Sequence, residues 1–430
     1  MRLAEAEQWL DGLINRERQP HVSYSRVGLE AIEALLARVG NPERGLSVVH
    51  IAGSKGKGST ALLAEALLLE LGESVGTFTS PHLERWTERF RIDGREVAGD
   101  TLAKVVEQIR PHVDALRQAD SSCWPSFFDA TTAAAFLLFA QAGVDRVVLE
   151  VGLGGRLDST NTVTPAVTCV TSIEYEHTDK LGTTLGEIAT EKAGILKPGA
   201  ACITGCLPPE AAKVVEERAA FLGIRLERLS PETLGEEESF HFADGFCFQA
   251  PLAAPGEHQR GNAAIAIAAV RALGAHSDER IADAARAAFA KASLPGRVEV
   301  VQRDPWVVID AAHTRESVRA LAAFLAGVET RWRHFVFSVS IDKALEPILD
   351  LLLPLAHELT LTRVESTRGM LPGEVARRIG SRAAQIEIHI TEDPGQAVRE
   401  ARRGLAPDAL LCVVGSVYLA GVARRELVES

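Results

Sequence analysis

The segment 48–60, which reads VVHIAGSKGKGST, constrains the fold of this chain more than any other. Val48–Ala52 is apolar and rich in β-branched residues, three glycines follow, and an alanine- and leucine-rich run starts near Ser59. This order predicts a buried strand, a glycine-rich turn and a helix. Such a turn binds phosphate, because backbone N–H groups and the helix N-terminus face the anion. We expect Lys57 to reach the terminal phosphates and a hydroxyl near Ser59 to lie close to Mg²⁺.

The spacing of this phosphate loop differs from the usual one. Only two residues separate Gly53 from Gly56, and Gly58 stands between Lys57 and the hydroxyl. A plain glycine turn is the alternative interpretation. The succession of strand, loop and helix favours nucleotide binding over that alternative.

Length, charge and hydropathy limit the class of protein. The 430 residues are 46% hydrophobic, enough for two or three domains. A net charge of -12 argues against nucleic acid or an anionic membrane as the main partner. No apolar run reaches the roughly 20 residues of a membrane span, and the acidic, amphipathic start is unlike a signal peptide. Six scattered cysteines favour idle thiols over a zinc site or disulfides. We therefore expect a cytoplasmic protein with neither nucleic acid nor membrane as partner.

Apolar runs of strand length alternate with helical stretches in the first part of the chain. This alternation predicts an α/β domain with a parallel, helix-covered sheet. The predicted strands are Val48–Ala52, Ser74–Thr79, Arg146–Val151, Ala166–Thr171 and Ala200–Thr204, and the predicted helices are Thr60–Leu71, Gly99–Gln118 and Ala130–Ala142. Short β-hairpins are expected between residues 230 and 252, followed by helices at Gln259–Leu273 and Ser277–Ala292.

A turn signal at 294–296 precedes a second run of the same alternation. We predict an N-terminal nucleotide-binding domain over residues 1–295 and a doubly wound, Rossmann-like C-terminal domain over 296–430. The predicted strands of the latter are Trp306–Asp310, His334–Ser338, Glu358–Leu361, Ile386–Ile390 and Leu410–Val414, and its predicted helices are Thr314–Ala326, Lys343–Leu355, Pro372–Gly380 and Pro394–Gly404.

Polar side chains follow several of the predicted parallel strands. Ligands bind beyond the carboxyl ends of such strands, where Ser80, Glu150 and His177 occur. Serine and carboxylate oxygens suit Mg²⁺, and histidine is a less usual ligand. Each residue has a structural alternative: Ser80 as a helix cap, Glu150 as an ion-pair partner of Arg156, and His177 as a hydrogen-bonded loop residue. Together, beside a phosphate loop, they predict a metal site.

Motifs along nearly the whole chain resemble the folylpolyglutamate synthase / dihydrofolate synthase family of the Mur ligase superfamily. They are Gly53–Thr60, Thr79–Leu83, Ser126–Thr132, Glu150–Asn161, Thr171–Thr178, 191–195 (EKAGI), 258–262 (HQRGN), 294–297 (LPGR), 310–313 (DAAH) and 415–416 (GS). The run EVGLGGRLD at 150–158 is the most specific of them. The resemblance implies a first domain like the central domain of Mur ligases, with the second domain closing over the active site.

The resemblance also implies roles for individual residues. ATP would be held by Gly56, Lys57, Gly58, Ser59, Gln259, Asn262, Arg297 and Asp310, and Mg²⁺ by Ser80, Glu150 and His177. Catalytic roles would fall to Lys57, Lys192 and His313, with Lys192 matching the lysine that the family carbamylates. The alternative for Lys192 is an ordinary exposed lysine on a helix. The folate pocket would include Tyr24, Ser25, Arg26, Val27, Ser126, Phe127, Phe128, Asp129, Leu157, Asp158 and Ser159.

The implied reaction joins L-glutamate to a folate-type carboxylate with ATP and Mg²⁺, through an acyl phosphate. The pocket departs from the family pattern, with Asp129 where glutamate is usual and Arg26 where bifunctional members often carry an acidic residue. We therefore expect addition of glutamate to a reduced folate, with dihydropteroate as a further substrate, by a monomer. A related ligase with another acid substrate and a non-catalytic nucleotide-binding protein on the same fold are the alternatives. A peptidoglycan Mur ligase is disfavoured, because only 52 residues precede Gly53.

Overall fold

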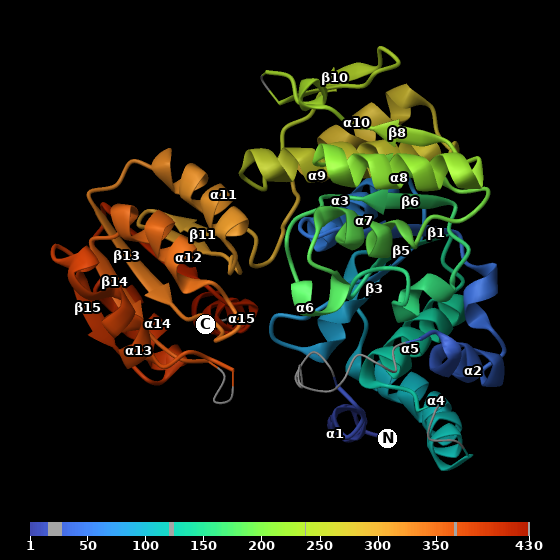
Figure 1. Cartoon of the computed structure of the whole chain (residues 1–430), viewed down its shortest axis with the longest axis horizontal. Helices are drawn as coiled ribbons and strands as arrows, with labels where there is room; N and C mark the ends of the chain where they lie inside the picture. The colour runs from blue at the N-terminus through green and yellow to red at the C-terminus, as the bar shows by residue number, and fades with distance from the viewer. Residues whose placement is uncertain (16–27, 120–123, 237, 365–367, 429–430) are drawn as a thin grey trace. The chain divides into compact units, whose positions relative to one another are not determined.

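The computed structural model describes residues 1–15, 28–119, 124–236, 238–364 and 368–428. The contacts between residues divide the chain into two compact units, one of Met1–Leu252 with Arg260–Lys291 and one of Ala253–Gln259 with Ala292–Ser430. Each unit is built around its own sheet with helices on both sides (Figure 1). The predicted α/β class, with a parallel sheet in each half of the chain, is confirmed.

In the described part of the first unit, eight strands form one sheet in the order β4-β3-β2-β5-β1-β6-β7-β8. They are β1 Val48–Ala52, β2 Val75–Phe78, β3 Phe90–Ile92, β4 Arg95–Glu96, β5 Arg146–Glu150, β6 Val167–Val170, β7 Ala201–Thr204 and β8 Leu226–Arg228. The five predicted strands form its parallel centre, with β1 between β5 and β6. The sequence pattern did not predict β3, β4 and β8, because these strands at the two ends of the sheet are only two or three residues long and carry charged side chains.

The helices of residues 1–291 cover both faces of this sheet. They are α1 Leu3–Asp11, α2 Glu30–Arg38, α3 Lys57–Glu70, α4 Gly99–Ala119, α5 Phe127–Ala142, α6 Thr178–Leu181, α7 Leu185–Ala193, α8 Pro209–Leu222, α9 Glu257–Ala272 and α10 Asp278–Phe289, with short 3-10 turns such as η3 Trp86–Arg89 and η4 Ser159–Thr162. The predicted hairpin is β9 Ser239–His241 paired with β10 Cys247–Gln249. The pattern had not identified α7 and α8, which pack against each other.

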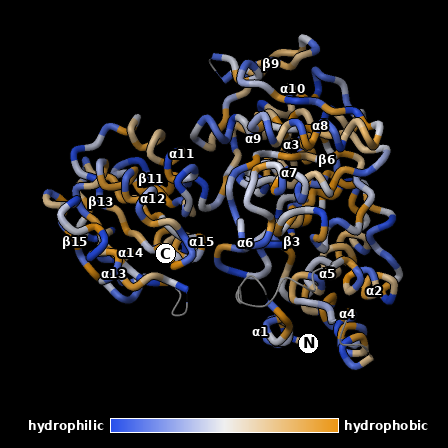
Figure 2. The backbone as a smooth tube through the Cα atoms, in the orientation of Figure 1, coloured by the Kyte–Doolittle hydropathy of each residue, from blue (hydrophilic) through white to orange (hydrophobic). Residues whose placement is uncertain are grey.

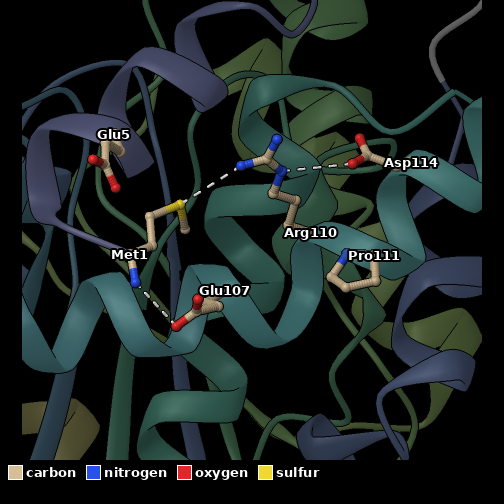
Figure 3. A pocket seen from close by; sticks show the side chains of 6 residues that line it. All are labelled: Met1, Glu5, Glu107, Arg110, Pro111 and Asp114. Carbon is tan, nitrogen blue, oxygen red and sulfur yellow. Dashed lines mark hydrogen bonds and ion pairs between the residues drawn. The ribbon is translucent and has the colours of Figure 1, made fainter.

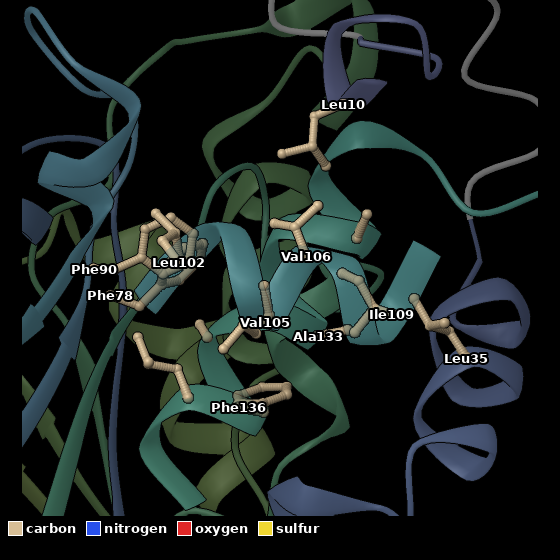
Figure 4. Packing of buried hydrophobic residues seen from close by; sticks show 14 of the residues in the cluster. Leu10, Leu35, Phe78, Phe90, Leu102, Val105, Val106, Ile109, Ala133 and Phe136 are labelled. Atoms are coloured by element: carbon tan, nitrogen blue, oxygen red, sulfur yellow. The ribbon is translucent and has the colours of Figure 1, made fainter. Parts of the chain in front are cut away.

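A core of large buried side chains packs one face of the sheet against helices. Phe78 of β2 and Phe90 of β3 meet Leu102 of α4 and Phe136 of α5 in a continuous core (Figure 4). On α4, apolar residues recur at helical spacing, so one stripe of this helix is buried. Burying each such side chain stabilises the fold by about 1.5–3 kcal/mol. The opposite face of β1, β2 and β5 packs against α3, and α10 packs on α3.

In the described part of the second unit, six strands form a sheet in the order β11-β12-β16-β13-β14-β15. They are β11 Glu299–Arg303, β12 Trp306–Ile309, β13 Trp332–Phe337, β14 Glu358–Leu361, β15 Glu387–Ile390 and β16 Ala409–Val414. The helices are α11 Arg315–Ala326, α12 Leu345–Leu352, α13 Pro372–Ile379, α14 Pro394–Arg403 and α15 Val417–Leu427. The sequence pattern had not identified β11, a partly exposed antiparallel edge strand, or the last helix, α15.

Hydrophobic residues follow the strands of both units, and hydrophilic residues are more frequent on the surrounding helices and loops (Figure 2). Among the residues that the structure describes, no helix is both long and apolar enough to span a bilayer.

Candidate active site

The phosphate loop connects β1 to α3. Gly56 has φ of +82° and caps α3, which begins at Lys57, three residues before the predicted start. The N–H groups of the first helical turn have no partner within the helix, so they are available to an anion. The Nζ atom of Lys57 donates to the Gly53 carbonyl at 2.9 Å. A Cβ atom on Gly53 would lie 1.8 Å from Oγ1 of Thr171, the residue after β6, so this close approach requires glycine.

Two predicted site residues lie directly against the loop glycines. A Cβ atom on Gly56 would lie 2.2 Å from Oδ1 of Asn262, and one on Gly58 would lie 3.3 Å from Oε2 of Glu150. Asn262 belongs to α9 and is buried, as is Gln259 one turn earlier. The tertiary structure therefore brings an amide from α9 and a carboxylate from β5 to the loop.

Glu150 ends β5 and is buried at the carboxyl edge of the sheet. Its Oε2 atom accepts a hydrogen bond from the backbone N–H of Ser80 at 2.9 Å. Ser80 precedes a cis peptide bond to Pro81 and does not begin a helix, so the helix-cap alternative is wrong. The ion-pair alternative for Glu150 is also wrong, because Arg156 pairs with Glu191 at 2.8 Å.

His177 is exposed, has φ of +45°, and precedes α6. Within the described ranges, no group of three or more His, Cys, Asp or Glu residues is arranged to hold a metal ion. The Glu150 carboxylate beside Ser80 nevertheless fits Mg²⁺, which takes few protein ligands and completes its shell with water and phosphate oxygens.

Lys192 on α7 is buried, so the exposed-lysine alternative is wrong. Its Nζ atom lies 2.7 Å from Oε1 of Glu176. Burial lowers the pKa of Lys192 to about 8, although the Glu176 charge opposes this shift. Burial alone would raise the pKa of Glu176, but the charges of Lys192, Lys57 and Lys55 outweigh it and lower that pKa to about 2. The two groups therefore form an ion pair near neutral pH.

Glu176 was not among the predicted site residues. Its place directly before His177, within the motif Thr171–Thr178 that follows a predicted strand, was the available signal. The approach of Lys55 to within 3.9 Å of Glu176 brings the carboxylate to the phosphate loop, across more than 100 residues of sequence.

Two of the predicted folate residues, Ser126 and Ser159, are hydrogen-bonded to a third, Asp129. Ser126 caps α5, and its N–H and Oγ both donate to Oδ2 of Asp129, at 2.7 and 2.6 Å. Oγ of Ser159 donates to Oδ1 at 2.6 Å, so both oxygens of Asp129 are occupied. Asp158 accepts from the Leu153 and Thr160 N–H groups, and burial raises its pKa.

Aromatic rings line the same region. Phe127 is buried, and the Cζ atom of the Arg89 guanidinium lies over its ring, 5.3 Å from the ring centroid. Phe128 is half-buried, and a Cβ atom on Gly152 would lie 2.6 Å from its ring. Leu157 is also half-buried. Arg89 was not predicted, because no local pattern indicates a buried arginine. Tyr24, Ser25, Arg26 and Val27 lie outside the described residues.

The remaining predicted residues lie in the second unit. Asp310, after β12, accepts hydrogen bonds from the N–H groups of Val298 and Ala312, both at 2.6 Å. Burial raises the pKa of Asp310 to about 6, although those bonds and the Arg297 charge oppose the shift. Nδ1 of His313 lies 2.8 Å from the Ala311 carbonyl, which can only accept, so the proton resides on Nδ1.

A surface hollow of about 590 Å³ lies elsewhere, between α1 and α4 (Figure 3). It is lined by Met1, Glu5, Glu107, Arg110, Pro111 and Asp114, and is crossed by the contact of the Met1 amino group with Glu107 at 3.1 Å. None of these residues belongs to the predicted site.

Comparison with known proteins bears directly on this site. Residues 296–417 match the family model described as Mur ligase, glutamate ligase domain. The dihydrofolate synthase/folylpolyglutamate synthase of Bacillus subtilis is 34% identical over 443 residues, covering 98% of both chains. A folylpolyglutamate synthase structure from Mycobacterium tuberculosis, complexed with ADP and AMPPCP, has a TM-score of 0.87 at 30% identity, covering 100% of this chain and 98% of that one.

A bifunctional folylpolyglutamate synthase/dihydrofolate synthase from Yersinia pestis, complexed with AMPPNP and a Mn ion, has a TM-score of 0.84 at 29% identity. That match covers 99% of this chain and 98% of the other. The fold, the site motifs and these relatives agree. The chain belongs to the folylpolyglutamate synthase / dihydrofolate synthase family of Mur-type ligases, as its motifs predicted.

Proposed function

We propose that this protein is an ATP-dependent ligase that attaches L-glutamate to a folate-type carboxylate. The observation that carries the proposal is the convergence of Asn262 and Glu150 on the glycines of one phosphate loop. Nucleotide and Mn complexes of family members support the choice of ATP and a divalent metal as ligands. We infer Mg²⁺ as the metal, because the Glu150 and Ser80 oxygens are hard donors.

In the proposed reaction, a carboxylate oxygen of the acid substrate attacks the γ-phosphorus of ATP and ADP leaves. The amino group of L-glutamate then attacks the carbonyl carbon of the acyl phosphate, phosphate leaves, and an amide bond remains. Lys57 and the first N–H groups of α3 would hold the phosphates and spread their developing charge. Mg²⁺, held by Ser80, Glu150 and His177, would supply further charge neutralisation when bound.

We propose that residues 296–430 complete the site by contributing Arg297, Asp310 and His313. We also propose that ATP contacts Gln259 of α9. Both Asp310 oxygens accept from backbone N–H groups, so this carboxylate also sets the loop that presents His313. An acyl phosphate hydrolyses readily, so closure of the second domain is expected to exclude water. Small-angle scattering should show compaction with an ATP analogue, and less of it for Asp310→Ala. An unchanged profile would contradict closure.

We propose that the folate-type acid binds beside Asp129, Phe128, Leu157 and Ser159. The shorter reach of Asp129 leads us to place reduced folate first and dihydropteroate second. The test is direct: each acid is supplied with ATP, Mg²⁺ and L-glutamate, and the products are identified by mass. Turnover of dihydropteroate alone would reverse the ranking. Inactivity with both acids would indicate a ligase with another acid substrate. Size-exclusion chromatography with light scattering would test the expected monomer.

A further inference from the structure

The segment Thr171–Glu176, which follows β6, is bonded to the phosphate loop along its length, and we call it the clamp segment. The N–H group of Ser54 donates to the Ser172 carbonyl at 2.8 Å. The N–H group of Lys55 donates to Oγ of Ser172 at 2.9 Å. Ser172 therefore binds two consecutive N–H groups of the loop, one through its backbone and one through its side chain.

Other bonds of the clamp segment fix the same part of the loop. Oγ1 of Thr171 donates to the Lys55 carbonyl at 2.5 Å. The N–H group of Glu174 donates to Oγ of Ser54 at 2.9 Å. These bonds orient the peptide units before Gly56, so the N–H groups at the start of α3 already have a defined direction.

The far end of the clamp segment is anchored to a different element. Glu176 forms its 2.7 Å ion pair with the buried Lys192 of α7 and lies 3.9 Å from Lys55. His177 is the next residue, so the loop and this histidine share one support. A shift of the clamp segment would disturb both.

We propose that the clamp segment sets the conformation of the phosphate loop before nucleotide binds, with Ser172 as the principal positioning residue. The proposal rests on the proposed nucleotide-binding function. Without the Ser172 hydroxyl, the Lys55 N–H group loses its acceptor and the loop must be ordered by the nucleotide itself. That ordering costs free energy and weakens nucleotide binding.

The test uses the full chain with Ser172→Ala, and with Ser172→Thr, which keeps a hydroxyl. Ser74→Ala is the matched control. Ser74 directly precedes β2, and its Oγ atom donates a 2.8 Å hydrogen bond to Asp93, so this variant also loses one side-chain hydrogen bond. We expect Ser172→Ala to bind ADP about three- to tenfold more weakly, the range of one lost hydrogen bond. The KM for ATP should rise similarly, while kcat and the KM for L-glutamate stay within about twofold. Ser172→Thr should restore most of the affinity.

Hydrogen exchange without nucleotide separates positioning from direct contact with ATP. The Lys55 N–H group should exchange faster in Ser172→Ala than in the wild type or Ser74→Ala. Unchanged exchange together with weaker ADP binding would make Ser172 a direct ligand and overturn the proposal. Unchanged ADP binding would overturn it as well. If wild-type protein failed to bind ADP, the proposed function would fail, whereas the exchange measurement would still test the clamp segment.

Discussion

Replacement of Gly56 by alanine tests the geometry of the phosphate loop most directly. Gly56 has φ of +82°, a conformation in which an L-residue is strained by roughly 1 kcal/mol. The added Cβ would also lie 2.2 Å from Oδ1 of Asn262, whereas ordinary contacts begin near 3.4 Å. The Asn262 side chain must therefore move by about 1 Å or more. Because Asn262 is buried in a closely packed region, little room is available for this movement.

Gly72 offers a control for the backbone strain alone. It has φ of +86°, and a Cβ atom there would meet nothing within 4 Å. We expect Gly72→Ala to lower the free energy of unfolding by about 1 kcal/mol and to leave nucleotide binding unchanged. Gly56→Ala should show a similar loss of stability and, in addition, at least about tenfold weaker ADP binding, because a buried hydrogen-bonding group is displaced.

The two effects are measured by denaturant unfolding and by calorimetric titration with ADP. The double variant Gly56→Ala/Asn262→Ala removes the clash. Asn262→Ala should therefore lower the ADP affinity less in the Gly56→Ala protein than in the wild type. Equal ADP affinity of Gly56→Ala and Gly72→Ala would refute the inference that Asn262 and the loop act together.

Three further outcomes are expected. Glu150→Gln keeps the acceptor for the Ser80 N–H group but removes the charge, so ligation should fall about 10²-fold or more with little change in thermal stability; wild-type turnover would exclude Glu150 as a metal ligand. Only a neutral amine reacts with CO₂, and the pKa of Lys192 is lowered to about 8, so ¹³C-bicarbonate labelling at Lys192 should increase between about pH 7 and 9 and vanish in Lys192→Met; a pH-independent signal would contradict this. Because the folded-state pKa of Asp310 is raised to about 6, the stability that this group contributes is present at low pH and lost as pH rises through 6. The free energy of unfolding in urea should therefore fall more in the wild type than in Asp310→Asn between about pH 5 and pH 7.5. An equal change in the two proteins would argue against a raised pKa of Asp310.

The central strands, several helices and the phosphate loop were predictable because their signals are local. β1 was predicted at its observed bounds, Val48–Ala52, since a buried parallel strand is a continuous apolar run. The antiparallel edge strand β11 was not, because its half-exposed residues carry no such run. The helix α3 begins earlier than predicted, at Lys57, because glycine at 58 lowers helix propensity while the N-terminal position tolerates it.

The sequence by itself determined the fold class, the family and the residues at the strand ends, because a motif such as EVGLGGRLD lies within one short segment. Only the tertiary structure decided which partners those residues have. Arg156 follows Glu150 closely in sequence yet pairs with Glu191, and Lys192 is a buried partner of Glu176. These contacts depend on the order of strands in the sheet, which places β6 and the clamp segment beside β1. The order of strands depends on packing between residues more than 100 positions apart. A local pattern of side chains carries no information about such contacts.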